Sequence, residues 1–235
     1  MEPETLPAED SYTPAPPTPD DEDDVPFVNE QVTVLYRRWR NEKYAPEVLP
    51  FDAKLIEDIR DLVEFVSEGL QEELDSGAAH DNDVDHRLRS VDLSRIRYVL
   101  REYLRIRLRK LEEWPQHYLQ GENVRWLSKA ESSHVRDLWQ IRSGFFHHRL
   151  LSAMPNTKQG LEDNVDLLEM VRRPNLDHYV YIRFLEDVPE TFLVDAADQA
   201  DLFRELKKNE TYLVNYSTVR KFFFQADLDG IVELV

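Results

Sequence analysis

The chain has 235 residues, no cysteine and a formal net charge of −18 at pH 7. Without cysteine it can form no disulfide, no thiolate zinc site and no thiol nucleophile. The acidic balance argues against a protein that binds nucleic acid mainly through phosphate contacts. No apolar run approaches about 18 residues and the N-terminal stretch is acidic, so we expect neither a transmembrane span nor a secretory signal.

Residues 1–27 are predicted to form a disordered tail. This stretch holds seven of the thirteen prolines, nine acids and no base. Such a composition offers too little apolar surface to offset the entropy cost of ordering the backbone. Two interpretations stay open: a solubilising extension, or a short linear motif in which Val25, Phe27 and Val28 bind a partner's groove behind the acidic run.

Helical periodicity begins directly after the tail. Residues 28–40 place their apolar side chains on one helical face, and residues 41–46 are expected to end this helix, because Pro46 disfavours a helical residue before it. Asp52 can cap a second helix by accepting a hydrogen bond from a free backbone N–H. The apolar residues of this second helix span only about 120°, which is typical of one covered face. They are Leu55, Ile59, Leu62, Val63, Val66, Leu70 and Leu74.

A polar, acidic loop is expected around residues 76–85, before a helix at 92–114 that organises the rest of the chain. Two stripes of apolar residues follow the helical period there and together cover roughly 200° of the circumference. A surface helix needs only about half of that arc, so we expect it to be covered from two sides. It is either a central core helix or a helix that also meets another protein. The stripes are Leu93, Ile96, Leu100, Leu104, Leu108 and Leu111, and Val99, Tyr103, Ile106 and Trp114.

Two arginines, Arg97 and Arg107, fall inside the apolar arc of this helix. Burying an unpaired charge costs several kcal/mol, so a covered guanidinium needs a carboxylate or carbonyl partner. We expect both arginines to pair with carboxylates, for which Glu42 and Glu47 are the candidates within the chain.

Other arginines lie on the polar side of the same helix, where Arg101, Arg105 and Arg109 form an i, i+4 row. Such a row could serve a nucleic-acid-binding module. Glutamates interrupt it and the chain is acidic overall, so an arginine-rich protein interface is favoured. The nucleic-acid module remains the alternative.

The last predicted helix begins at a capping box formed by Ser128 and Glu131, whose side chains satisfy each other's free backbone donors. Apolar residues then continue at helical spacing until Pro155, where the pattern stops. We therefore expect four or five helices over residues 28–154. The apolar positions of this last helix are Val135, Leu138, Trp139, Phe145, Phe146 and Leu150.

The pattern changes after a polar linker. Residues 178–184, 191–194 and 211–216 are rich in β-branched and aromatic side chains and predict strands. Residues 218–225 fit a short helix, and residues 231–235 fit a terminal strand. The predicted fold class is α+β, with an all-α region followed by a small β-rich domain. A domain of about 60 residues is only marginally stable by itself, so we expect the β-rich part to pack against another domain or protein.

Patterns that carry catalysis or bind metals are not found in the sequence. Residues 81–92 imitate a calcium loop, but its glycine position is His86 and its bidentate glutamate is replaced by Asp92. Adjacent His147 and His148 point about 100° apart on a helix and cannot clamp one metal as an i, i+4 pair would. Nucleotide-binding and hydrolase motifs are missing as well. We expect no enzyme activity, no cofactor and no small-molecule substrate.

Four ordered blocks resemble the GINS family of eukaryotic DNA replication proteins, and within it the subunit-4 or SLD-five type. They are residues 39–49, 95–108, 174–183 and 230–235. The resemblance covers about 28–235 and includes the order of the two parts, with the helical part first.

The resemblance implies a helical A-type domain at 28–155, a linker at 156–172 and a B-type domain at 173–235. It also implies a non-catalytic scaffold subunit of a nuclear heterotetramer. The partners would be the three paralogous GINS subunits, with subunit 1 the closest contact. That assembly would join the MCM ring and a RecJ-like cofactor in the replicative helicase, and would meet polymerase epsilon and DNA only indirectly.

Residues expected at subunit interfaces or in structural roles lie in or beside the first three blocks. In the helical part they are Trp39, Asn41, Glu42, Lys43, Tyr44, Pro46, Ile96, Arg97, Leu100, Tyr103, Leu104, Arg107, Leu108 and Leu111. In the β-rich part they are Leu176, Asp177, Tyr179 and Val180.

Overall fold

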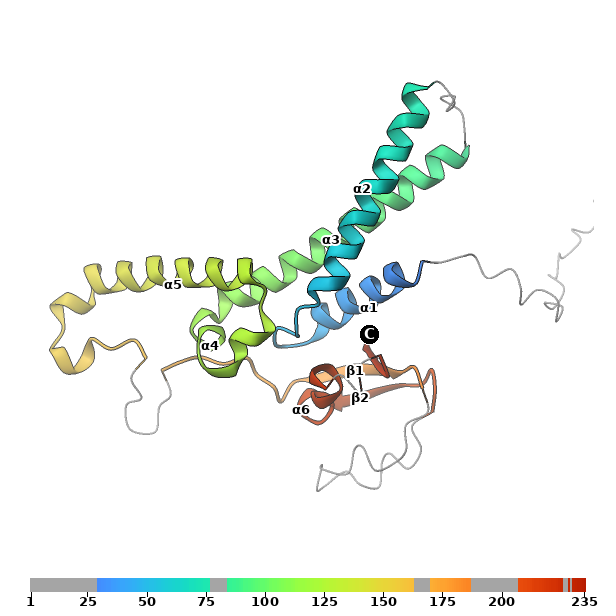
Figure 1. Ribbon diagram of the computed structural model, residues 1–235. Helices are drawn as coiled ribbons and strands as arrows, with labels where there is room; N and C mark the ends of the chain where they lie inside the picture. The colour runs from blue at the N-terminus through green and yellow to red at the C-terminus, as the bar shows by residue number, and fades with distance from the viewer. Residues whose placement is uncertain (1–28, 77–83, 163–169, 187–206, 226–227, 229) are drawn as a thin grey trace, which may run out of the picture.

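The computed structural model describes residues 29–76, 84–162, 170–186, 207–225, 228 and 230–235. The predicted tail and the strand predicted at 191–194 lie outside the described residues. Figure 1 shows a body from which two helical projections extend, with a small sheet lying beneath the first helix.

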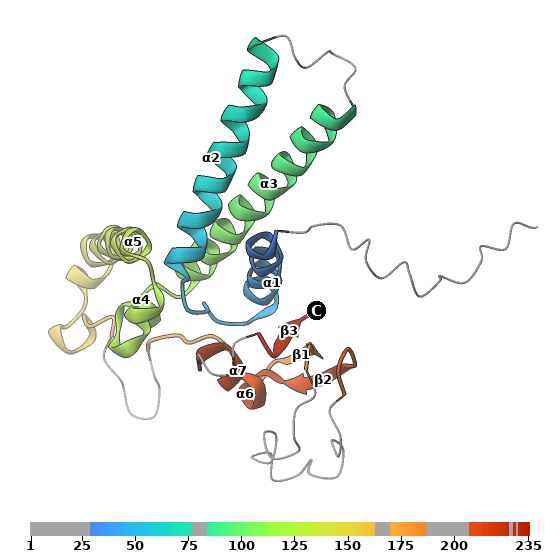
Figure 2. The same ribbon diagram turned by 45° about the vertical axis from the view of Figure 1, so that its right-hand side comes forward.

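Among the described residues, the N-terminal part contains five α-helices, which agrees with the four or five that were predicted. The upper projection in Figures 1 and 2 is a pair formed by the second and third helices, and the fifth helix extends in another direction. The helices are α1 (Glu30–Tyr44), α2 (Ala53–Asp75), α3 (Val84–Glu113), α4 (Pro115–Leu119) and α5 (Lys129–Arg149).

The ends of the first two helices follow from their capping residues. The side chain of Asn29 accepts a hydrogen bond from the backbone N–H of Gln31 and begins α1. Asp52 accepts from the backbone N–H of Leu55 at 3.1 Å and begins α2, as predicted. Helix α1 continues four residues past the predicted end, and Ala45 is then extended because proline follows it.

Helix α3 begins at Val84, so the predicted loop was wrong over its last residues and the predicted helix was too short. Asp85 lies in the first turn, where a negative charge stabilises the helix dipole. Arg89 forms ion pairs with Asp85 on its own helix and with Glu73 on α2. These contacts stabilise a helical turn whose acidic sequence is also typical of a loop.

Helix α3 is covered from two sides, as predicted, and the cover comes from the chain's own helices. Val99 and Tyr103 are buried in one cluster with Leu35 of α1 and Ile59 of α2. Farther along, Leu111 is buried with residues of α4 and α5. The central-core interpretation therefore accounts for much of the wide apolar arc.

A three-stranded antiparallel sheet in the order β2-β1-β3 forms the C-terminal part. It consists of β1 (Tyr179–Phe184), β2 (Thr211–Asn215) and β3 (Val232–Leu234), so three of the predicted strands are confirmed. The single helix predicted at 218–225 is two short ones, α6 (Tyr216–Val219) and α7 (Lys221–Phe224). Their buried side chains share one core with the strands. The α+β class is confirmed.

The sheet packs against the helical part, as expected for so small a unit. Ala45 and Leu49, which follow α1, belong to the same buried cluster as the strands. Arg37 of α1 donates a hydrogen bond to the carbonyl of Gly230, just before β3, at 3.4 Å. Gly230 has φ +91°, and a Cβ there would lie 3.3 Å from Arg37, so both the turn and this approach favour glycine.

Candidate functional site

A buried guanidinium joins three α-helices, the loop after α1 and the short 3-10 helix η2 (Gly121–Trp126). Arg107 of α3 has no solvent exposure. Its Nε donates to Glu131 at 2.7 Å and its Nη1 donates to Glu42 at 3.0 Å. Its Nη1 also reaches the carbonyl of Leu49 at 2.6 Å, and its Nη2 reaches the carbonyl of Trp126 at 3.0 Å. The pairing of Arg107 with a carboxylate and with carbonyls is confirmed.

A second cation helps to balance the buried carboxylates. Lys110 donates to Glu42 Oε1 and to the carbonyl of Glu47, both at 2.9 Å. Burial lowers the pKa of Lys110, and the charge of Glu42 only partly offsets that effect. For Arg107 the balance is reversed, because Glu42 and Glu131 raise its pKa more than burial lowers it. This centre is a charge network held inside one chain.

The ion pairs predicted for Glu47 and for Arg97 were wrong. Glu47 binds Arg220 of the C-terminal part in a bidentate pair, with N–O distances of 2.5 and 2.9 Å. Arg97 lies exposed on α3, and no ion pair of Arg97 occurs among the described residues. Arg97 lies at the edge of the predicted apolar arc, beyond the part of α3 that packs in the cluster with α1 and α2.

The sequence reading missed Glu131 as the second partner of Arg107. Its capping role is confirmed: Ser128 donates its backbone N–H to Glu131 Oε2 at 2.7 Å. The same carboxylate also accepts two hydrogen bonds from Arg107. A capping box already explains a glutamate at this position, so the sequence carried no separate signal for the second role.

The acidity of Glu131 leads to a prediction about pH. Burial raises the pKa of this carboxyl, but hydrogen bonds and charge from Arg107, with donors from Ser128, outweigh burial and hold the pKa below its ordinary value. A lowered folded-state pKa contributes stability that is present above about pH 4.5 and is lost as pH falls through the folded pKa. Urea unfolding followed from about pH 6 to about pH 2.5, a range that spans the unfolded pKa and the lowered folded pKa, should therefore show a shallower loss of stability for Glu131→Gln. An unchanged pH slope would contradict this assignment.

The contact between α1 and the sheet depends on Asn41. Its buried side-chain oxygen accepts the backbone N–H of Leu234 at 2.8 Å. We expect Asn41→Ala to lower the free energy of unfolding by about 1–3 kcal/mol, because the buried N–H of Leu234 loses its acceptor. Hydrogen exchange should rise at β3, while exchange in α2 stays unchanged. Equal exchange at β3 in both proteins would refute the role of Asn41.

The expected site residues fall into three groups by exposure. Buried inside the chain are Asn41, Glu42, Tyr103, Arg107, Leu111 and Val180. Partly buried are Trp39, Pro46, Ile96, Leu100, Leu104, Leu108 and Leu176. Exposed are Lys43, Tyr44, Arg97, Asp177 and Tyr179.

An exposed apolar stripe runs along the N-terminal half of α3. Val84, Leu88, Val91 and Tyr98, which we name the α3 stripe, are each about half exposed or more, with Tyr98 at 57%. With Arg95 they are spaced by four and three residues in turn, as in a coiled-coil seam. A groove of about 510 Å³ lies where the stripe meets Tyr36 and Trp39 of α1, and its other lining residues are Ser90, Val91, Ser94, Arg95, Tyr98 and Val99.

Two further apolar surfaces are exposed. The first is the far half of α5, where Ile141 is 71% exposed and Phe145 is 59% exposed. The second is the sheet face opposite α6 and α7, where Tyr181 pairs with Leu213 across the strands and Tyr179 lies beside them. Exposed apolar patches of this kind are typical of surfaces that bind other proteins.

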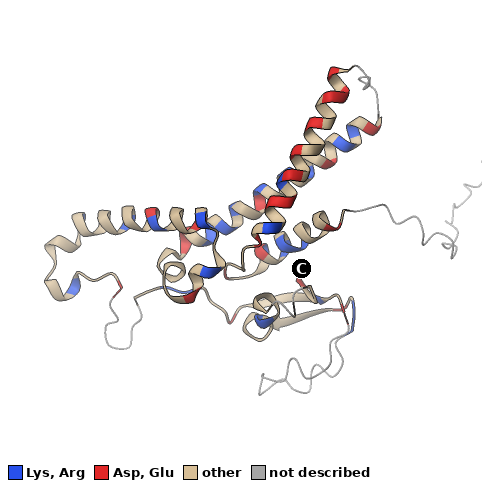
Figure 3. Cartoon of the chain, viewed as in Figure 1, with Lys and Arg blue, Asp and Glu red and all other residues tan. Residues whose placement is uncertain are grey.

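The arginine row of α3 is exposed, as predicted. Arg101, Arg105 and Arg109 lie on the surface, and Arg105 forms an ion pair with Glu102 at 3.0 Å. Figure 3 shows both basic and acidic residues along this helix. Within the described part of the chain no cluster of three metal-ligating side chains occurs. None of its helices is long and apolar enough to cross a membrane.

Comparison with known proteins decides the family. A family model described as "DNA replication complex GINS protein SLD5 C-terminus" matches residues 174–235. The mouse DNA replication complex GINS protein SLD5 is 32% identical over 198 residues, which cover 81% of this chain and 84% of the mouse protein. The chain belongs to the SLD5 family of GINS proteins.

Plant and fungal members of the SLD5 family match over similar lengths. The Arabidopsis thaliana protein is 29% identical over 206 residues, which cover 85% of this chain and 90% of that protein. The Schizosaccharomyces pombe protein is 28% identical over 202 residues, which cover 86% of this chain and 90% of its own. The family predicted from four sequence blocks is therefore confirmed.

Proposed function

We propose that this SLD5-family chain is a non-catalytic scaffold subunit of a heterotetrameric GINS complex in the nucleus. The exposed apolar surfaces carry the proposal, because a chain that worked alone would gain by covering them. The name of its relatives, DNA replication complex GINS protein SLD5, supports the same role. The other three subunits of the complex are the proposed partners.

The α3 stripe is the proposed contact with a sister subunit, with subunit 1 as the candidate. Its four-three spacing fits a helix of the partner, whose side chains would pack between those of the stripe. The stripe at 93–111 is a poorer candidate, because α1 and α2 already pack against it. Leu104, for example, lies in that internal cluster, so a charge there would also damage this chain's own fold.

The wider role follows from membership in the complex. We propose that the complex joins the MCM ring and a RecJ-like cofactor to form the replicative helicase, and helps to tether polymerase epsilon. DNA would then be contacted only indirectly. The division into a helical domain at 28–155, a linker at 156–172 and a β-rich domain at 173–235 is proposed to match the two-domain plan of the family.

Reconstitution tests this proposal. The four GINS subunits, the MCM ring and the RecJ-like cofactor should form one helicase-sized particle in size-exclusion chromatography. Omitting this chain should abolish the particle. A complete particle that forms without this chain would refute the scaffold role.

The alternative, a nucleic-acid-binding module, rests on the exposed row of Arg101, Arg105 and Arg109. It requires the isolated chain to bind DNA with an affinity that falls steeply with salt. It also requires that changing the three arginines to glutamine weakens binding. Lack of binding by the isolated chain at low salt would remove this alternative.

A further inference from the structure

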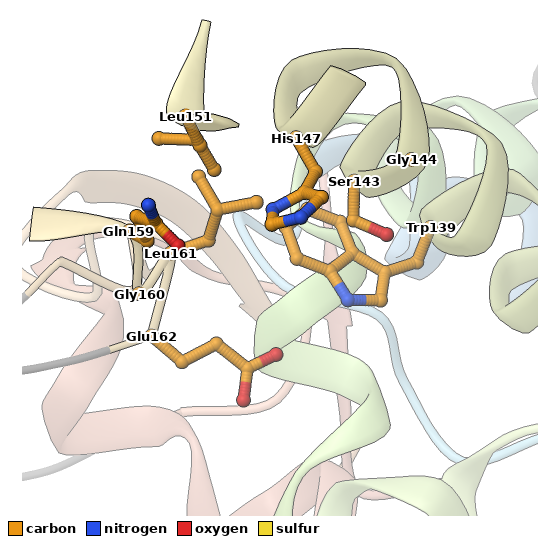
Figure 4. Close-up of a pocket in the computed structure, with 9 residues that line it drawn as sticks. All are labelled: Trp139, Ser143, Gly144, His147, Leu151, Gln159, Gly160, Leu161 and Glu162. Carbon is orange, nitrogen blue, oxygen red and sulfur yellow. The ribbon is translucent and has the colours of Figure 1, made fainter. Parts of the chain in front are cut away.

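A cavity of about 520 Å³ lies between the far half of α5 and the segment 159–162, shown in Figure 4. It is separate from the α3 stripe and from the sheet face. Its lining residues come from α5, from the turn that follows α5 and from residues 159–162. They are Trp139, Ser143, Gly144, His147, Leu151, Gln159, Gly160, Leu161 and Glu162.

Two kinds of wall face each other across this cavity. The rings of Trp139 and His147 lie on the α5 side, and the carboxylate of Glu162 extends toward them from the opposite segment (Figure 4). Leu151 and Leu161 supply aliphatic surface beside them. Glu162 is the only Asp, Glu, Lys or Arg among the nine lining residues, so the fixed charge of the cavity is negative.

The backbone of α5 leaves the cavity open. Gly144 lies inside this helix, and a Cβ added there would meet no atom within 4 Å. Glycine lowers helix stability relative to alanine, so local stability does not explain its presence. Gly69 of α2 has equally open surroundings, so glycine alone identifies no site. At Gly144 the open space coincides with the cavity and its facing walls.

We propose that this cavity receives a lysine or arginine side chain from a partner polypeptide. The charged head would lie between the indole face of Trp139 and the carboxylate of Glu162, since cations are attracted both to aromatic faces and to carboxylates. The methylene stem would pack against Leu151 and Leu161, as long basic side chains do on apolar surface.

Other classes of ligand fit less well. An anion would be repelled by Glu162, and an uncharged aliphatic side chain would leave this carboxylate without a partner. The proposal concerns one cavity and one side chain, and it does not depend on membership in a four-subunit complex. It can therefore fail while the proposed function stands.

The test uses the full chain labelled with ¹⁵N, at a concentration at which light scattering shows a monomer, and follows the four tryptophan indole signals by NMR. The probe is N-acetyl-arginine methylamide, and N-acetyl-norleucine methylamide is its uncharged control. The titration is run at constant ionic strength and about pH 7.5, where an ordinary histidine is neutral. The variant Trp139→Phe identifies the signal of Trp139, and Trp39, Trp114 and Trp126 serve as internal references.

We expect a saturable shift of the Trp139 signal with the arginine probe and none with the norleucine probe. Glu162→Gln, an exposed substitution, should weaken binding about fivefold, since an exposed ion pair and a cation–π contact each contribute modestly. Equal shifts with both probes, or shifts of all four indole signals, would overturn the proposal. So would undiminished binding to Glu162→Gln.

Discussion

Replacing Arg107 with leucine should lower the free energy of unfolding by about 3–5 kcal/mol, the loss typical when one partner of a buried ion pair is removed. Glu131 would keep a buried negative charge with no cation beside it, and Glu42 would retain only Lys110. The carbonyl of Leu49 would lose its donor, and the carbonyl of Trp126 would keep only the backbone N–H of Phe51. Urea denaturation of the wild-type and variant chains measures this loss.

The control is Arg105→Leu on the same helix. Arg105 also pairs with a carboxylate, Glu102, but its side chain is 60% exposed. Exposed ion pairs contribute about 0–1 kcal/mol, so this variant should unfold near the wild-type midpoint. A double variant, Arg107→Met with Glu131→Leu, should recover part of the loss by removing the orphaned carboxylate. Equal midpoints for Arg107→Leu and Arg105→Leu would contradict a buried charge centre.

The second large effect is expected at the α3 stripe. The double variant Leu88→Asp/Tyr98→Asp should leave the free chain folded, since both side chains are more than half exposed. It should weaken assembly with the sister subunits by about 100-fold or more, because each position places a charge in an apolar contact and loses a large side chain. Co-purification of the three sisters with the tagged variant measures this loss.

The matched control is Arg60→Asp, which places an aspartate at an exposed position of α2 away from the stripe. It should assemble like the wild-type chain. Circular dichroism and thermal unfolding of both variants would show whether each chain remains folded. A folded double variant that still assembles normally would exclude the α3 stripe as a subunit contact.

Local signals in the sequence predicted the helical part well. Asp52 and Ser128 cap α2 and α5 as expected, because a capping side chain acts within three residues of its own position. Pro46 keeps Ala45 out of the helical conformation, as predicted, although α1 continues to Tyr44. Glu42 was one of two candidate carboxylates predicted for Arg97 and Arg107, and it pairs with Arg107, because a buried guanidinium requires a carboxylate.

Long-range partners could not be read in the same way. Glu47 is separated from Arg220 by 173 positions, and only the docking of the sheet brings them together. Glu131 already had a local explanation as a capping residue, which hid its contact with Arg107.

The error at the start of α3 had the largest consequence for function. The loop predicted at residues 76–85 and the helix predicted only from residue 92 did not place Val84, Leu88 and Val91 on one helical face. Periodicity over 92–114 then pointed to a stripe that the chain mostly covers itself. Three of the four residues of the α3 stripe therefore lie before residue 92, outside the predicted helix.

We have proposed that this chain is a subunit that binds three sister subunits. This proposal is tested most directly by light scattering of the purified chain, alone and co-expressed with those subunits. We expect the chain alone to self-associate through its exposed apolar surfaces, and a 1:1:1:1 particle to form in the presence of the sister subunits. A chain that stays monomeric and binds none of the three sister subunits would contradict the proposed scaffold role.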